Sequence, residues 1–216
     1  MIKISEKIKN IELNMSLGIL TATVTVRPSC HEIVSLLEHE VKNIESQYTL
    51  ENYRNETLEA CRKIYKALGK DPSRYRISSD SLFRRIIKGK GVYYVNNIVD
   101  INNIISLRTL WSVGAYDLNK IQGDIVYGVG TKEDLYEGIG RGLLNIDKLP
   151  VLIDSISPFG SATSDSLRTM VTTETTELLM VVHAFGGNDG LVEAMNDMKI
   201  YLEQYGSATQ VDIKII

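Results

Sequence analysis

The spacing of hydrophobic and polar positions predicts regular elements along most of the chain. Residues 18–26 alternate threonine with aliphatic side chains, which is typical of a strand with one face in the core. From His31 to Ile44 apolar residues recur at helical spacing, which predicts a helix with Ser29 as its N-cap. A second amphipathic helix follows and ends at Gly69, where a left-handed residue is expected.

The sequence Lys70-Asp71-Pro72 is typical of a turn and is the best candidate for a boundary within the chain. We therefore expect the chain to consist of two parts. Residues 1–72 would form an N-terminal strand plus two-helix element, packed on a main domain of residues 73–216.

The pattern also predicts the elements of the main domain. We expect a short helix capped by Ser78, Ser79 or Asp80, a buried helix over residues 92–108, and a late helix capped by Asn188. Strand-like runs lie at 124–129, 150–154, 178–184 and 211–215. Because strands and helices are mixed without a strict βαβ rhythm, we predict an α+β fold, a mixed β-sheet sandwich with packed helices.

The composition is that of a globular protein whose core needs no metal or disulfide. The chain has 216 residues, of which 44% are hydrophobic, and roughly 70% of the unfolded chain's surface should be buried at this length. The sequence has no signal-peptide pattern and no apolar run of membrane-spanning length. Since only Cys30 and Cys61 occur, far apart in the sequence, we expect a protein of the reducing cytoplasm without membrane contact.

Positive charge is concentrated in one segment although the whole chain has a net charge of −3. Between Arg62 and Lys90 ten Lys or Arg residues stand against Asp71 and Asp80, a local balance of +8. Such a segment is typical of a surface that faces phosphates, and equally of a solvated helix face. The residues that we expect to contact RNA phosphates are Arg74, Arg76, Arg84, Arg85 and Lys88.

The usual catalytic motifs are absent from the sequence. His31, His39 and His183 form no zinc-binding pattern, and no nucleophile elbow occurs, so we predict no metal and no covalent catalysis. The glycines at 138–142 complete no phosphate-loop motif, and we interpret them as turns or as an anion-binding nest. We predict no cofactor.

Two other polar segments each have two interpretations. The 92–108 segment carries Asn96, Asp100 and Asn103 among apolar residues, either as a structural buried network or as the lining of a pocket. Residues 157–176 are dense in hydroxyl groups, which is typical of a functional loop or of Ser/Thr turns.

Four separated motifs together resemble the B3/B4 domain of the phenylalanyl-tRNA synthetase beta chain, in a free-standing form. These motifs are 99–108 (VDINNIISLR), 114–123 (GAYDLNKIQG), 150–154 (PVLID) and 163–172 (TSDSLRTMVT), and the resemblance covers about residues 74–185. It implies an α+β sandwich that binds tRNA or aminoacyl-tRNA and hydrolyses a mischarged aminoacyl ester. Nothing resembles the aminoacylation core, so we do not expect a complete aminoacyl-tRNA ligase.

The resemblance also implies which residues would form the site. The motif that begins at Gly114 usually begins with a histidine in the family, so the imidazole expected to position water is missing here. The acid that reads the substrate hydroxyl would be Asp165, which becomes our candidate catalytic residue. The substrate pocket would be lined by Asp100, Asn103, Tyr116, Asp117, Ser164 and Arg168.

Two functions therefore follow from the sequence. The first is an editing-type domain that binds tRNA and hydrolyses mischarged aminoacyl-tRNA in trans. The alternative is a non-catalytic module that binds RNA or an amino acid and retains the fold without hydrolysis.

Overall fold

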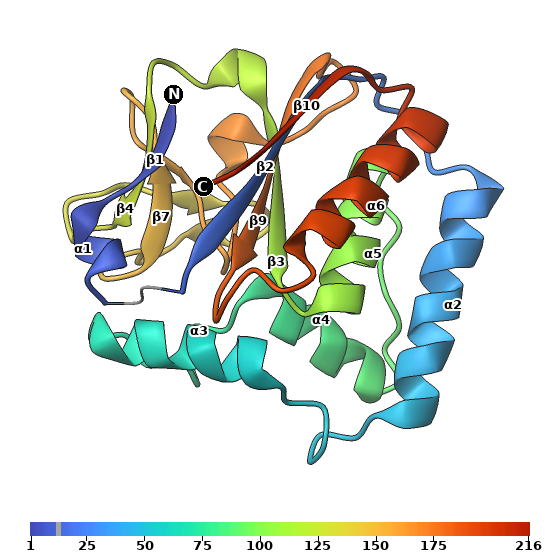
Figure 1. The fold of residues 1–216 in the computed structure, drawn as a ribbon, viewed down its shortest axis with the longest axis horizontal. Coiled ribbons are helices and arrows are strands. Elements are labelled where there is room, and N and C mark those ends of the chain that lie inside the picture. The colour runs from blue at the N-terminus through green and yellow to red at the C-terminus, as the bar shows by residue number, and fades with distance from the viewer. Residues whose placement is uncertain (12–13) are drawn as a thin grey trace.

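Two four-stranded sheets and a group of helices make up the structure, a computed structural model that describes residues 1–11 and 14–216 (Figure 1). The first sheet has the strand order β1–β4–β7–β8, and only the β1–β4 pair is parallel. The second has the order β10–β2–β9–β3 and is antiparallel throughout. The first sheet is therefore mixed, as predicted.

The strands are short in the first sheet and longer in the second. In the first they are β1 (Ile2–Ile4), β4 (Ile125–Val129), β7 (Pro150–Ile153) and β8 (Pro158–Gly160). In the second they are β2 (Ser16–Thr23), β3 (Ser112–Asp117), β9 (Glu177–Ala184) and β10 (Thr209–Ile215). A separate hairpin is formed by β5 (Glu137–Gly138) and β6 (Gly142–Leu143).

The helices lie mainly on one side of the second sheet (Figure 1). They are α1 (Glu6–Lys9), α2 (His31–Gln47), α3 (Glu56–Ala67), α4 (Ser78–Ile87), α5 (Asn97–Thr109) and α6 (Leu191–Tyr205). Two 3₁₀ turns, η1 (Leu118–Lys120) and η2 (Leu167–Thr169), follow β3 and β8. None of the helices in the described part of the chain has the length and apolar character that a bilayer crossing requires.

The second sheet, to which β2 belongs, lies between the first sheet and the helices. A side chain at Gly18 would meet Met195 of α6, so this position of β2 faces the helices. On the first sheet's side, the hydroxyl of Tyr127 in β4 lies 3.1 Å from Nδ1 of His183 in β9, between two fully buried residues. The layer order is therefore first sheet, second sheet, helices.

Residues 1–72 contribute directly to this arrangement. Strand β2 pairs with β9 along its whole length and with β10 on its other side, so the second sheet combines both parts of the expected division. One hydrophobic core includes residues of α2 and α3 as well as those of the sheets. A division of the chain at residue 72 stays a prediction.

The pattern predicted the elements well but the starts of four helices wrongly. The N-cap of α2 is Cys30, since the hydroxyl of Ser29 donates to Asp100 instead. The N-caps of α4 and α6 are Ile77 and Gly190, rather than a residue of 78–80 or Asn188. Residues 92–96 are not helical, and Asn96 caps α5 by accepting from the amides of residues 98 and 99.

Candidate functional site

A cavity of about 380 Å³ lies where α4, α5 and β3 meet the loop that follows β8, and we call it the central cavity. It joins residues of the 99–108 motif to residues of the 163–172 motif, two of the motifs that carry the resemblance. Its polar lining includes Ser81, Arg85, Asn102, Asn103, Ser106, Ser164 and Asp165.

Asp165 is the acid in this lining, and its environment favours the protonated form. Burial raises its pKa to about 7, although a hydrogen bond from Tyr116 and the backbone of Ser161 act in the opposite direction. The Tyr116 hydroxyl donates to Oδ1 of Asp165 at 2.7 Å. A carboxyl group with a pKa near neutrality can accept or give a proton under physiological conditions, which is the property of a general acid or base.

The side chain of Tyr116 packs over two glycines to reach Asp165. A Cβ atom at Gly114 in β3 or at Gly160 in β8 would overlap the Tyr116 hydroxyl. The ring is fully buried and packs edge-on against Phe159, with the ring centroids 5.1 Å apart. The space that a side chain at Gly114 would need is therefore filled by the tyrosine that holds Asp165.

Two buried polar atoms of the central cavity have no hydrogen-bond partner among the described residues. They are Oδ1 of Asn102, on α5, and Nε of Arg85, on α4. A buried acceptor or donor without a partner is costly, so a small rotation of either side chain that brings this atom to a ligand in the cavity would be favourable.

Cationic residues surround the central cavity on two sides. A hollow of about 330 Å³, the basic groove, is lined by Arg76, Ser81, Arg84, Arg85, Lys88 and Lys90. A third cavity of about 300 Å³ has Arg74, Arg76 and Arg141 in its lining. Ser81 lines all three, so they form one continuous hollowed surface around the first turns of α4.

The cations of the basic groove differ in whether they have polar partners within the fold. Arg84 donates to the Tyr53 hydroxyl at 2.9 Å, and Arg76 lies 3.9 Å from Asp80, so both have neighbours within the fold. Arg85, Lys88 and Lys90 form no ion pair among residues 1–11 and 14–216. These three can therefore pair with an external anion without breaking an internal ion pair.

Of the residues expected in the pocket, Asn103, Ser164 and Asp165 line the central cavity, and Tyr116 contacts it through Asp165. Asp100 and Asp117 do not line it. Asp100 is fully buried and accepts from the Ser29 hydroxyl and the Val95 amide. Asp117 accepts from the hydroxyl of Thr175 at 3.0 Å. Both acids stabilise the fold. Asp100 thus agrees with the structural interpretation of the polar stripe, whereas Asn103 lines the cavity.

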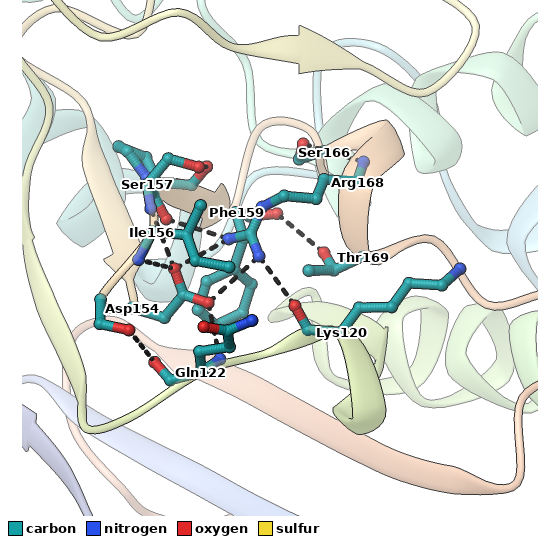
Figure 2. A network of polar contacts seen from close by, with 11 residues as sticks. Lys120, Gln122, Asp154, Ile156, Ser157, Phe159, Ser166, Arg168 and Thr169 are labelled. Atoms are coloured by element: carbon teal, nitrogen blue, oxygen red, sulfur yellow. Dashed lines mark hydrogen bonds and ion pairs between the residues drawn. The ribbon is translucent and has the colours of Figure 1, made fainter.

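Arg168 was expected in the pocket and instead clamps three loops together, as Figure 2 shows. Its guanidinium donates to both oxygens of Asp154, at 2.9 and 3.1 Å, and to the carbonyls of Lys120 and Ser157. Burial by itself would raise the pKa of Asp154, but hydrogen bonds from backbone amides and from Arg168 outweigh it, so the pKa is lowered. Arg168 is thus committed to an internal ion pair.

Of the residues expected to contact phosphates, Arg74 lines the third cavity and Arg76, Arg84, Arg85 and Lys88 line the basic groove. Lys70, which belongs to the same positive segment, is buried and donates to the carbonyls of Asn145 and Asp147.

Sequence reasoning missed several lining residues. Asn102 and Ser106 lie four residues apart and share one face of α5. This spacing was a signal in the sequence, but the polar stripe that we considered ran through Asp100 and did not include them. Arg141 comes from the tip of the β5–β6 hairpin, where the glycines at 140 and 142 have positive φ angles, as turn glycines do.

No group of three or more His, Cys, Asp or Glu residues in the described ranges is arranged to hold a metal ion. His183 is fully buried in β9, and burial lowers its pKa to about 3, so it is neutral at physiological pH.

The fold and site define an α+β protein in which a cavity that holds one acid, Asp165, adjoins a basic groove. The family model of the B3/4 domain matches residues 60–195, so the chain belongs to the B3/4 domain family, and the resemblance seen in the sequence is confirmed. No curated protein matches the chain.

Among solved structures, the chain is similar to an N-terminal fragment of the phenylalanyl-tRNA synthetase beta-subunit from Pyrococcus horikoshii. The identity is 15% and the TM-score 0.48, and the match covers 100% of this chain and 50% of that one. This chain therefore spans half the length of that fragment.

Proposed function

We propose that the protein binds the aminoacylated 3′ end of a tRNA in the central cavity and hydrolyses the ester of a mischarged amino acid in trans. One observation carries this proposal: a single cavity combines an acid whose pKa is about 7 with two unpartnered polar atoms, next to a basic groove. The groove would take the phosphates and the cavity the aminoacyl group. This activity would belong to the cytoplasm.

Asp165 would act as the general base, because the family's usual histidine is absent at Gly114. Its carboxylate would accept a proton from a water molecule, whose oxygen attacks the carbonyl carbon of the ester. The bond from that carbon to the ribose oxygen breaks, and the proton passes to the leaving oxygen. The products are a free amino acid and a tRNA with its terminal hydroxyl restored.

The acceptor oxygen of Asn102 supports the same placement. An aminoacyl ester carries an α-ammonium group with three donors, which needs acceptors in a buried site. Asn102 lines the same cavity as Asp165 and its Oδ1 has no partner, so a rotation of this side chain would let it provide acceptors together with Asp165.

The test is hydrolysis of a panel of mischarged aminoacyl-tRNAs, including tyrosine on a phenylalanine tRNA, by the wild type and by Asp165→Asn. We expect the variant to lose at least about 100-fold in turnover, the range of general-base catalysis. In the wild type the rate should rise with pH and level off above pH 7, since Asp165 accepts a proton only when ionised. Asp189→Asn, an exposed acid outside the cavity, is the matched control.

Retained turnover in Asp165→Asn would contradict the role of Asp165. Absence of turnover in the wild type, with tRNA bound, would establish the alternative, a binding module without hydrolysis. The overlap between a side chain at Gly114 and Tyr116 favours that alternative, because it leaves no room for the histidine. A protein that binds no tRNA would contradict the proposed function and would leave, of the alternative, only a module that binds an amino acid.

A further inference from the structure

Three large apolar side chains are exposed in succession beside the central cavity. Tyr93, Tyr94 and Val95 have exposed fractions of 66%, 51% and 60%, in a segment that belongs to no helix or strand. Single exposed apolar residues are common, whereas a contiguous group next to a cavity is typical of a binding surface.

The backbone of this segment is held by the protein interior. The amide of Val95 donates to Oδ1 of Asp100 at 3.0 Å, and the Ser29 hydroxyl donates to the other oxygen at 2.6 Å. Asp100 itself is fully buried. The exposed side chains are therefore carried on a fixed backbone, which lowers the entropy cost of binding to them.

Tyr93 is the member of this group best placed to contact a ligand in the cavity. It lines the central cavity, and the guanidinium of Arg85 lies 4.1 Å from the centre of its ring. Arg85 also lines the basic groove, so Tyr93 stands where the cavity and the groove meet. With most of the residue exposed, the ring remains open to a second flat partner.

We propose that Tyr93, supported by Arg85, is a platform on which an unpaired nucleobase of a single-stranded RNA end stacks. The proposal rests on the proposed function. It adds the terminal base to the groups that the protein would contact, which are otherwise the phosphates and the aminoacyl group. Aromatic rings bind unpaired bases by stacking, and a neighbouring arginine adds a cation–π contribution. The terminal base would lie on Tyr93, with its phosphates in the basic groove and its ribose at the mouth of the cavity.

The charge of the surroundings favours a nucleic acid as the partner. The basic groove has five cationic residues and no acid in its lining. An aromatic side chain next to such a groove provides both parts of single-strand recognition, a track for the backbone and a face for a base.

The experiment compares two single-stranded RNA oligonucleotides that differ only at the 3′ end, one with an adenosine and one with an abasic nucleotide. Binding is measured by fluorescence anisotropy with the wild type, Tyr93→Ala and Tyr93→Phe. We expect Tyr93→Ala to bind the intact oligonucleotide about 5- to 150-fold more weakly and Tyr93→Phe to bind like the wild type. On the abasic oligonucleotide, Tyr93→Ala and the wild type should bind equally.

Tyr94→Ala is the matched control, because Tyr94 is exposed in the same segment, lies near Glu38 and does not line the cavity. It should bind both oligonucleotides like the wild type. If the wild type binds RNA and Tyr93→Ala binds it equally well, the platform is wrong and the proposed function stands. If the wild type binds neither oligonucleotide nor aminoacyl-tRNA, both fail. An unchanged circular dichroism spectrum shows that each variant is folded.

Discussion

At the scale of single residues, two acids that lie in neighbouring parts of the fold have opposite environments. Asp154 accepts from several backbone amides and from Arg168, which stabilise its ionised form and lower its pKa. Asp165 is half-buried and has fewer donors, and desolvation raises its pKa to about 7. Well-satisfied acids stabilise a fold, whereas an acid with a raised pKa in a cavity is a candidate for chemistry.

Replacing Arg168 by alanine should therefore affect stability first. The substitution leaves the buried carboxylate of Asp154 without its cation, so we expect the free energy of unfolding to fall by about 3 kcal/mol. Urea denaturation at pH 7 measures this. Arg141→Ala, an exposed arginine, should change it by less than about 0.5 kcal/mol.

The pH dependence of the same variant gives a second check. Because folding lowers the pKa of Asp154, its stabilisation is present above the ordinary aspartate pKa, near 3.9, and is lost as the pH falls below it. The stability of Arg168→Ala should fall less steeply in that acidic range, since the carboxylate has lost its cation. If Arg168→Ala unfolds at the same urea concentration as the wild type, the ion pair with Asp154 adds nothing to the free energy of unfolding.

The sequence could identify Asp165 but could not sort the other acids. Asp100, Asp117 and Asp165 all have polar neighbours in the sequence, and only the packing decides which acid faces a cavity. Asp100 is covered because Ser29, seventy-one residues away, donates to it. A partner this distant leaves no local pattern, so the pocket prediction included two acids that stabilise the fold.

At the scale of elements, local patterns predicted most of what the structure contains. The helix from His31 and the closing strand with Val211 are confirmed, because each carries its own hydrophobic period. The strand expected over 18–26 is also present, but it runs from Ser16 to Thr23 and leaves residues 24–26 outside it. The helix starts were less predictable. Side chains that are able to cap, such as Ser29 and Ser79, form tertiary hydrogen bonds instead, and Ser79 donates to the Leu110 carbonyl.

Strand β3 offers a test of how one element supports the site. In Gly114→Ala the new methyl group would collide with the Tyr116 ring, which must then move away from Asp165. We expect the free energy of unfolding to fall by about 1–3 kcal/mol, the usual cost of overpacking. Thermal or urea denaturation of the purified variant measures the loss.

A double-mutant cycle separates this collision from other effects of the substitution. In a Tyr116→Ala background the ring is gone, so Gly114→Ala should cost much less than it does in the wild type. Equal costs in the two backgrounds would mean that the Tyr116 ring is not what requires glycine at this position.

At the scale of the whole molecule, the distribution of charge matters more than its sum. The chain has a net charge of −3, yet its cations gather around α4, where the basic groove adjoins the central cavity. The sequence predicted this segregation, but not which cations face outward together. Lys70 is buried, and Lys66 is exposed on α3 without lining the basic groove, although both belong to the same positive segment.

Lys88 lines the basic groove and Lys66 does not, and this difference predicts how salt affects RNA binding in a variant of each. Each phosphate that a lysine neutralises releases about one counterion, so the logarithm of the binding constant falls with the logarithm of the salt concentration. In Lys88→Ala the slope should become shallower by about 0.7, the value for one contact to a single strand, and binding at low salt should weaken. Lys66→Ala removes the same charge outside the groove and should leave the slope unchanged. Equal changes in the two variants would mean that RNA responds to the overall charge of the segment, and the basic groove would then not be the phosphate site.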